Sequence, residues 1–226
     1  MPTTTPLSYD DLPDLLTRLT GDEKHDWSAL STLDVIWVLY DRVLRVDPDD
    51  TDDPARDRFL LSKGHGPAAY YAVLAAKGFL DPDELDRFGA FDSILGYHPD
   101  RMLVPGAEIS SGSLGHGLPI AVGMTLALDA QERGGRVVCL VGDAELDEGS
   151  NWEAVQLAGR LGLGRLTAVV VDNRSSTYHW PGGIDARFAA EGWAAERVDG
   201  RDHAALERAL SQTGDRPGLV VAEVAR

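Results

Sequence analysis

Two oxygen-bearing side chains, Asp143 and Asn173, follow two short apolar runs of the sequence. Asp143 comes after residues 137–141 and one glycine, and Asn173 comes shortly after residues 166–171. If both runs are neighbouring parallel strands, these side chains meet at one edge of a sheet, where ligands bind in such folds. A carboxylate, an amide oxygen and a nearby backbone carbonyl suit Mg²⁺, which leaves further positions for phosphate oxygens. The structural alternative is that Asp143 caps a helix and Asn173 makes a turn.

The segments around these residues alternate between strand-like and helix-like patterns. The second half predicts strands near 137–141, 166–171, 194–198 and 219–224, with helices near 149–161, 185–191 and 202–212 between them. This alternation is typical of an α/β fold, a parallel sheet with helices on both faces. The first half predicts helices near 7–19, 32–45, 67–77 and 117–132. We therefore expect a single domain over residues 1–226 with an N-terminal helical extension.

The composition is that of an acidic globular protein. Its 226 residues include 21 Lys and Arg against 37 Asp and Glu, which gives a net charge of −16. Such a charge repels a phosphate backbone, so we expect no nucleic-acid partner, and a phosphorylated ligand needs a metal ion or aimed backbone N–H groups. The single Cys139 excludes an internal disulfide. Because no apolar run approaches the roughly 20 residues that span a bilayer, we expect a cytoplasmic protein without membrane contact.

The segment GDAELDEGSNWEAVQLAGRLGLGRLTAVVVDN resembles the thiamine diphosphate (ThDP) motif of the transketolase family. In that family an Asn follows a Gly-Asp-Gly at such a distance, and here Asn173 stands thirty residues after Asp143. Three further segments are similar to family motifs in the family's order: LSKGHGPAAYYAVLAAKGF (61–79), GYHPDRMLVPGAEISSGSLGHGLPIAVGMTLA (96–127) and FAAEGWAAERVDGRDHAAL (188–206). The resemblance covers residues 20–224 and implies the diphosphate-binding domain of a ThDP-binding fold.

The resemblance implies a joint metal and cofactor site. Asp143, Asn173 and the backbone carbonyl of Ser175 correspond to the family's Mg²⁺ ligands. The implied ThDP contacts are His65, Gly112, Ser113, Leu114, Gly142, Asp143, Ala144 and Asn173. Bound ThDP forms a carbanion on its thiazolium ring, so the protein must hold the diphosphate and manage protons on sugar hydroxyls.

Three histidines and one glutamate are the catalytic candidates that the resemblance implies. His65 and His98 correspond to histidines near the diphosphate and the donor sugar, and histidine suits proton transfer because its pKa lies near neutral. His25 aligns with a proton-transfer histidine through its spacing to Asp34, although its immediate neighbours differ. A surface histidine before a helix is the alternative for His25. Glu148 corresponds to a carboxylate of the family's dimer interface.

The remaining histidines have less defined roles. His116 replaces a common Gln and is expected to face the same pocket, and His179 is a candidate for the substrate mouth. His203 is expected to face solvent on a helix. Whether His25, His116 and His179 take part in the reaction stays open at this point.

The chain departs from the family pattern in three places. Ala144 stands where a Gly is usual, the segment between Asn173 and Phe188 is short and distinctive, and the sequence ends at Arg226. A full transketolase continues into a pyrimidine-binding domain, which supplies the glutamate that activates the cofactor, and a C-terminal domain. We therefore expect a second subunit that carries those domains in an α₂β₂ assembly. Apolar surface in residues 112–127 and 149–161 would be buried in its interface.

The leading prediction is a subunit of a heteromeric, ThDP-dependent, transketolase-like transferase. It would help to move a two-carbon ketol unit from a ketose, such as a sugar phosphate, to an acceptor. Two alternatives stay open: a related ThDP enzyme subunit that acts on pyruvate or another 2-oxo acid, and a non-catalytic stabilising subunit. The sequence does not name the donor or the acceptor, and it does not separate primary from secondary metabolism. It also does not show whether the partner replaces the family's C-terminal active-site His, which has no counterpart here.

Overall fold

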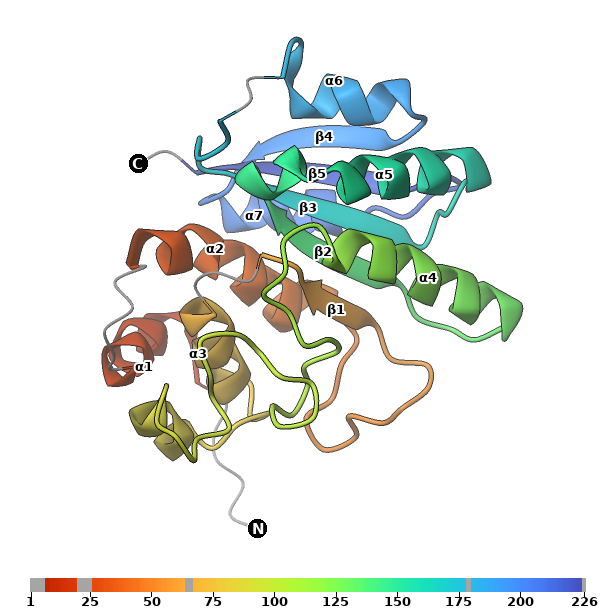
Figure 1. Cartoon of the computed structure of the whole chain (residues 1–226). Helices are drawn as coiled ribbons and strands as arrows, with labels where there is room; N and C mark the ends of the chain where they lie inside the picture. The colour runs from red at the N-terminus through yellow and green to blue at the C-terminus, as the bar shows by residue number, and fades with distance from the viewer. Residues whose placement is uncertain (1–6, 20–25, 64–66, 178–179, 225–226) are drawn as a thin grey trace.

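The structure, a computed structural model, describes residues 7–19, 26–63, 67–177 and 180–224. Its centre is a five-stranded parallel sheet in the order β1-β2-β3-β5-β4 (Figure 1). The strands are β1 (Arg58–Leu61), β2 (Val137–Gly142), β3 (Leu166–Asp172), β4 (Ala194–Asp199) and β5 (Gly218–Glu223). The register pairs Gly142 with Val171, which brings the carboxyl ends of β2 and β3 side by side.

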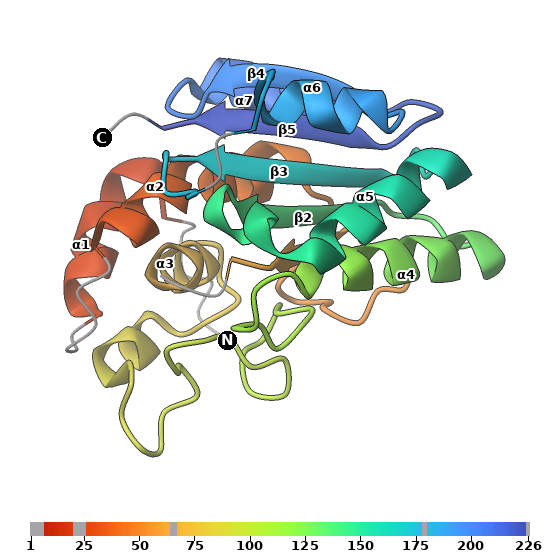
Figure 2. The same cartoon turned by 45° about the horizontal axis from the view of Figure 1, so that its top comes forward.

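Helices cover both faces of this sheet (Figures 1 and 2). They are α1 (Leu12–Arg18), α2 (Asp26–Val38), α3 (Ala68–Ala76), α4 (Gly117–Ala130), α5 (Gly149–Leu161), α6 (Gly183–Ala190) and α7 (His203–Leu210). The described residues also form four short helical turns: η1 (Tyr9–Asp11), η2 (Leu39–Val43), η3 (Pro82–Arg87) and η4 (Ala144–Asp147). The core with α1, α2, α3 and α7 lies on one face, and the core with α4, α5 and α6 lies on the other. The predicted α/β class is therefore confirmed.

Side chains of the central strands alternate between these two cores, because successive residues of a strand point to opposite faces. On β3, Val169 and Val171 join the core with α2 and α7, whereas Ala168 and Val170 join the core with α4 and α5. All six residues of β2 are buried. This burial on both faces explains why the run of β2 is continuously apolar in the sequence.

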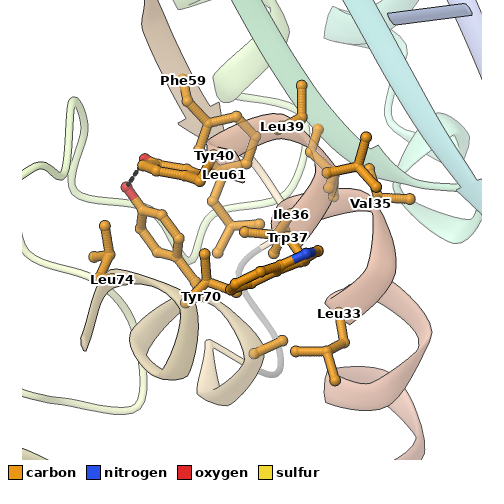
Figure 3. Close-up of a cluster of buried hydrophobic side chains, with 14 of the residues drawn as sticks. Leu33, Val35, Ile36, Trp37, Leu39, Tyr40, Phe59, Leu61, Tyr70 and Leu74 are labelled. Carbon is orange, nitrogen blue, oxygen red and sulfur yellow. Dashed lines mark hydrogen bonds between the residues drawn. The ribbon is translucent and has the colours of Figure 1, made fainter. Parts of the chain in front are cut away.

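An aromatic cluster fixes the helices α2 and α3 against β1 (Figure 3). The hydroxyl groups of Tyr40 and Tyr70 lie 3.2 Å apart, and Phe59 packs edge-on against Tyr40. The Tyr70 hydroxyl also donates to the carbonyl oxygen of Gly106 at 3.1 Å. Each phenol thus has the polar partner that a buried hydroxyl requires.

Some boundaries differ from the sequence-based prediction. The strand β1 was not predicted, because it has four residues and directly follows a charged loop. The helix predicted over residues 32–45 begins at Asp26 and passes at Leu39 into the π-helical turn η2. Among the helices of the described ranges, none combines the length and the apolar character that a bilayer crossing needs. The assignment of the whole chain to a single domain stays a prediction.

Candidate functional site

The candidate site lies at the carboxyl ends of β1, β2 and β3. Asp143 directly follows β2 and Asn173 directly follows β3, and the backbone N–H of Asp143 donates to the carbonyl oxygen of Val171 at 3.2 Å. Both residues are buried, with 2% of Asp143 and 6% of Asn173 exposed. The structure thus places the two oxygen-bearing residues at adjacent strand ends.

The loop after β3 folds back onto Asp143. The backbone N–H of Ser175 donates to Asp143 Oδ2 at 2.6 Å, the Ser175 hydroxyl to Oδ1 at 2.5 Å, and the N–H of Ser176 to Oδ2 at 3.0 Å. The chain turns at Arg174, which has a left-handed backbone conformation with a φ of 59°. A non-glycine residue rarely adopts this conformation unless its surroundings hold it there. Ser175, the third predicted ligand, therefore lies directly against Asp143.

Asp147 anchors the same loop at a second point. Its Oδ1 accepts from the Ser176 hydroxyl at 3.0 Å, and its Oδ2 accepts from the Thr177 hydroxyl at 2.9 Å. Asp147 was not among the predicted site residues. Its place in the acidic run after Asp143 was the available signal, but only the fold shows that this run reaches the loop after β3.

The side chain of Asn173 provides a test of whether a cation fits this site. Its Nδ2 lies 3.4 Å from the hydroxyl oxygen of Ser31, whereas its buried Oδ1 has no hydrogen-bond partner among the described residues. A buried acceptor without a partner costs about 1–3 kcal/mol. An oxygen-seeking cation between this atom and Asp143 would offset that cost, so the donor set fits Mg²⁺. Over the described ranges no three His, Cys, Asp or Glu side chains form a metal-type cluster, so a cation here would depend on amide and carbonyl oxygens as well.

Lys63 is a buried cation that the sequence analysis missed, although it stands in the LSKGHG segment. It is 9% exposed, and its Nζ lies 3.1 Å from the hydroxyl oxygen of Ser31. Burial lowers the pKa of Lys63 to about 8, while the nearby charges of Asp143 and Glu145 oppose that change. The site therefore contains a positive charge at neutral pH, despite the net negative charge of the chain.

Two predicted site residues, His98 and Gly112, lie in contact. Gly112 has a φ of 129°, and a Cβ added there would lie 2.8 Å from Cδ2 of His98. Only glycine allows both this backbone conformation and this close approach. His98 and Ser113 are exposed, and Leu114 is half-buried. The structure thus joins the segment of His98 to the predicted cofactor loop.

The beginnings of α4 and α5 lie beside this loop. A Cβ added at Gly115 would lie 2.7 Å from Cβ of Glu148, which is exposed at the N-terminus of α5. His116 is exposed at the N-terminus of α4, and Ala144 is half-buried. These positions leave Glu148 accessible to a second polypeptide.

Three histidines with predicted roles, His25, His65 and His179, lie outside the described residues. The prediction for His203 was wrong: its Nε2 lies 2.8 Å from Oδ1 of the buried Asp34, and its ring packs edge-on against Tyr9. Asp34 also accepts hydrogen bonds from Tyr9 and Arg201. Both Asp34 oxygens therefore have partners within the chain.

The parallel sheet and the paired oxygens at its carboxyl edge define a ligand-binding α/β domain. The family model described as "Transketolase, thiamine diphosphate binding domain" matches residues 20–224, and the chain belongs to this family. The family resemblance inferred from the sequence motifs is therefore confirmed.

Individual relatives differ in name and length. The chain is 54% identical over 224 residues to "Ferredoxin fas2" of Rhodococcoides fascians, covering 98% of this chain and 74% of that protein. It is 34% identical over 210 residues to an apulose-4-phosphate transketolase subunit of Actinobacillus succinogenes, covering 89% of this chain and 76% of that protein. A solved transketolase from Leishmania mexicana superposes with a TM-score of 0.81 at 26% identity, covering 97% of this chain and 37% of that chain.

The name ferredoxin is that relative's name and does not describe this chain. This chain has one cysteine, the buried Cys139. It cannot by itself supply the four thiolates that commonly hold an iron–sulfur cluster.

Proposed function

We propose that this chain is the diphosphate-binding subunit of a split, ThDP-dependent, transketolase-like transferase. The observation that carries the proposal is the placement of Asp143 and Asn173 at adjacent strand ends, with a buried and unpartnered amide oxygen on Asn173. Family membership independently supports ThDP as the ligand. The enzyme would be cytoplasmic and would transfer a two-carbon ketol unit between sugars.

The residues of this edge would hold the cofactor through a metal ion. Asp143, Asn173 Oδ1 and the Ser175 carbonyl would bind Mg²⁺, and the metal would neutralise a diphosphate that an acidic chain otherwise repels. Gly142 and Ala144, two of the predicted ThDP contacts, flank Asp143, and their small size would leave room for phosphate oxygens beside its carboxylate. When bound, ThDP supplies the carbanion that accepts the ketol unit.

Residues of the neighbouring loops would orient the cofactor and the sugar. The predicted contacts of Gly112, Ser113 and Leu114 are with the organic part of ThDP. His98, which packs on Gly112 and is exposed, would face the donor sugar, where an imidazole can move a proton at a hydroxyl oxygen. His65 and His25 remain proposed for the diphosphate and for proton transfer. Glu148 would join a network of carboxylates at the subunit interface.

A second subunit is part of the proposal, because this domain offers contacts to only part of ThDP. The chain spans about three quarters of the two relatives above and 37% of the solved transketolase. Four large apolar side chains on α4 and α5, which lie side by side in Figures 1 and 2, are between 38% and 52% exposed: Ile120, Leu126, Leu157 and Leu161. We propose that a polypeptide with the pyrimidine-binding and C-terminal domains covers this face in an α₂β₂ assembly.

Sugar phosphates are the proposed donor class, by analogy with the relative named for apulose 4-phosphate. The alternatives are a subunit that acts on pyruvate or another 2-oxo acid, and a stabilising subunit without catalytic residues. The buried polar groups at the site favour an enzyme, since a scaffold gains nothing from an unpaired buried amide oxygen.

The test combines this chain with its second subunit in the presence of ThDP and Mg²⁺. Ketol transfer from ketose phosphates by the mixture, and by neither polypeptide on its own, is the expected result. Turnover of pyruvate but not of ketose phosphates would select the 2-oxo acid alternative. Full activity of a complex that contains Asp143→Ala would instead select the stabilising role.

A further inference from the structure

Glu145, two residues after Asp143, is a buried carboxylate to which neither the resemblance nor the proposed function assigns a role. It lies in the turn η4 and is 1% exposed. Its Oε1 accepts from the backbone N–H of Gly115 at 2.9 Å and from the Ser62 hydroxyl at 2.5 Å. Its Oε2 accepts from the backbone N–H of Gly142 at 3.3 Å. One side chain therefore contacts the segments after β1 and before α4 as well as the end of β2.

The geometry requires an acceptor at each oxygen of Glu145. The N–H groups of Gly115 and Gly142 can only donate, and they point at different oxygens of the same carboxylate. Burial raises the pKa of the Glu145 carboxyl, and the hydrogen bonds from Ser62, Gly115 and Gly142 and the charge of Lys63 oppose that rise. A glutamine at this position would turn its NH₂ group towards one of the two donors.

Hydrogen bonds with Glu145 and two neighbouring serines hold the loop of residues 112–117, which leads into α4. The Ser62 hydroxyl accepts from the backbone N–H of Gly117 at 2.9 Å, and the Ser150 hydroxyl donates to the carbonyl oxygen of Gly115 at 2.8 Å. Gly115 has a φ of 81°, and a Cβ added there would lie 2.5 Å from Ser150 Oγ. Because the loop is tightly enclosed here, a small shift of Glu145 must move it.

We propose that Glu145 is a positioning residue that fixes the loop of residues 112–117 relative to Asp143. Asp143 and Glu145 lie on one short turn. This turn therefore fixes the position of the loop relative to the proposed metal ligand Asp143. This inference rests on the proposed function for its consequence, which is that both parts of ThDP can be contacted at once. The anchoring itself rests only on the contacts of Glu145.

The experiment uses the full chain and two variants, Glu145→Gln and Ser62→Ala. Amide hydrogen exchange reports local opening of the loop, and ThDP affinity in the presence of Mg²⁺ reports its consequence. Glu145→Gln should speed exchange at Gly115 and Gly142 by about tenfold or more and weaken ThDP binding by about 10–100-fold, the range for outer-shell partners. Ser62→Ala removes the hydroxyl that contacts Gly117 and Glu145 but keeps both N–H contacts of Glu145, so exchange should speed up at Gly117 and not at Gly115. Equal loosening at Gly115 would show that Ser62, and not Glu145, holds the loop, which tests the proposal even if Glu145→Gln fails to fold.

Two control variants separate positioning from general loss of stability. Glu153→Gln makes the same chemical change at an exposed position of α5, and Val155→Ala removes buried volume from α5. Neither should change exchange at Gly115 relative to the rest of the chain, and Glu145→Asp, which keeps the carboxylate, should restore part of the ThDP affinity. Exchange in Glu145→Gln that matches Glu153→Gln would overturn the proposal, as would a loosened loop with unchanged ThDP affinity. If the wild-type chain with its partner binds no ThDP while Glu145→Gln loosens the loop, the proposed function fails and the anchoring stands.

Discussion

The two edges of the sheet use polar side chains in opposite ways. At the amino edge, Arg58 begins β1, and Arg136 and Arg165 directly precede β2 and β3. Each of these guanidinium groups donates to backbone carbonyl oxygens. At the carboxyl edge, the Asn173 Oδ1 has no partner among the described residues and Lys63 is buried with a lowered pKa. The amino-edge guanidinium groups donate to carbonyl oxygens within the chain, whereas the carboxyl edge retains in Asn173 Oδ1 an acceptor that a ligand would satisfy.

Arg136 shows how completely the amino edge is paired. Its Nη1 donates to the carbonyl oxygen of Leu210 at 2.7 Å and its Nη2 to that of Val43 at 2.9 Å, so it ties the ends of α7 and η2 to β2. Its Nε lies 3.6 Å from the carboxylate of Asp57, which also accepts from the backbone N–H of Arg45. Cations near helix C-termini are favourable, so stability alone accounts for this edge.

Asn173→Leu should give the largest effect at the carboxyl edge, because it should weaken ligand binding with little effect on stability. It replaces an amide with one long contact to Ser31 and an unpartnered oxygen by an apolar side chain of similar size, so the free energy of unfolding should change by no more than about 1 kcal/mol. Mg²⁺-dependent ThDP binding should weaken by more than about 100-fold, because a direct ligand matters at least as much as an outer-shell partner. Calorimetric titration and urea unfolding measure the two quantities. Asn173→Asp, which keeps a ligand oxygen, is the control and should retain binding.

Arg136→Met makes the converse test at the amino edge. It removes the donor to the carbonyl oxygens of Leu210 and Val43 and the cation beside Asp57, so the free energy of unfolding should fall by about 3 kcal/mol. ThDP binding, measured well below the unfolding midpoint, should not change. Arg165→Met is the matched control, because that arginine is 41% exposed and its loss should cost less than about 1 kcal/mol. Equal losses in the two variants would contradict the argument from burial.

Lys63→Met tests the carboxyl edge through the dependence of stability on pH. Because the folded pKa of Lys63 is about 8 and its ordinary value is 10.5, the unfolded chain holds more protons between these pH values. Stability from this group therefore rises with pH, by at most about 1.4 kcal/mol per pH unit. In urea titrations, the unfolding free energy of the wild type minus that of Lys63→Met should become more positive between pH 8 and pH 10. If the unfolding free energies of the two proteins change with pH in parallel, burial does not lower the pKa of Lys63. Lys77→Met is the control for the loss of a lysine elsewhere in the chain.

The sequence predicted the architecture because burial on both faces leaves an unambiguous pattern. The runs around Val169 and Leu140 are apolar without interruption, and Asp202, which was within a predicted helix, caps α7 by accepting from Ala204 and Ala205. The strand β1 has too few residues to show such a pattern. Its pairing with β2 depends on contacts across the chain.

The candidate site was predictable only where one motif contains its residues. Asp143 and Asn173 have a fixed spacing along the chain, so the motif places both. Lys63 and Glu145 act through residues far from them in sequence, such as Ser31 and Gly115, and no local pattern reports those contacts. His203 was wrongly placed in solvent for the same reason, because the N-terminal segment that covers it is distant in sequence.

The His203 contact provides the smallest test, because it joins a half-buried imidazole to the buried Asp34, whose two oxygens both have partners within the chain. Asp34 joins α2 to Tyr9 and to the segment of Arg201 and His203. Burial raises the pKa of Asp34, but these hydrogen bonds outweigh burial and hold the pKa below its ordinary value. His203→Phe keeps an aromatic ring against Tyr9 and removes one hydrogen bond, so urea unfolding at pH 7 should show a loss of about 1 kcal/mol. ThDP binding should stay unchanged, because neither oxygen of Asp34 is left for a ligand. Weaker ThDP binding in His203→Phe would show that the cluster around Asp34 contributes to ligand binding. It would contradict the conclusion that this cluster is satisfied within the chain.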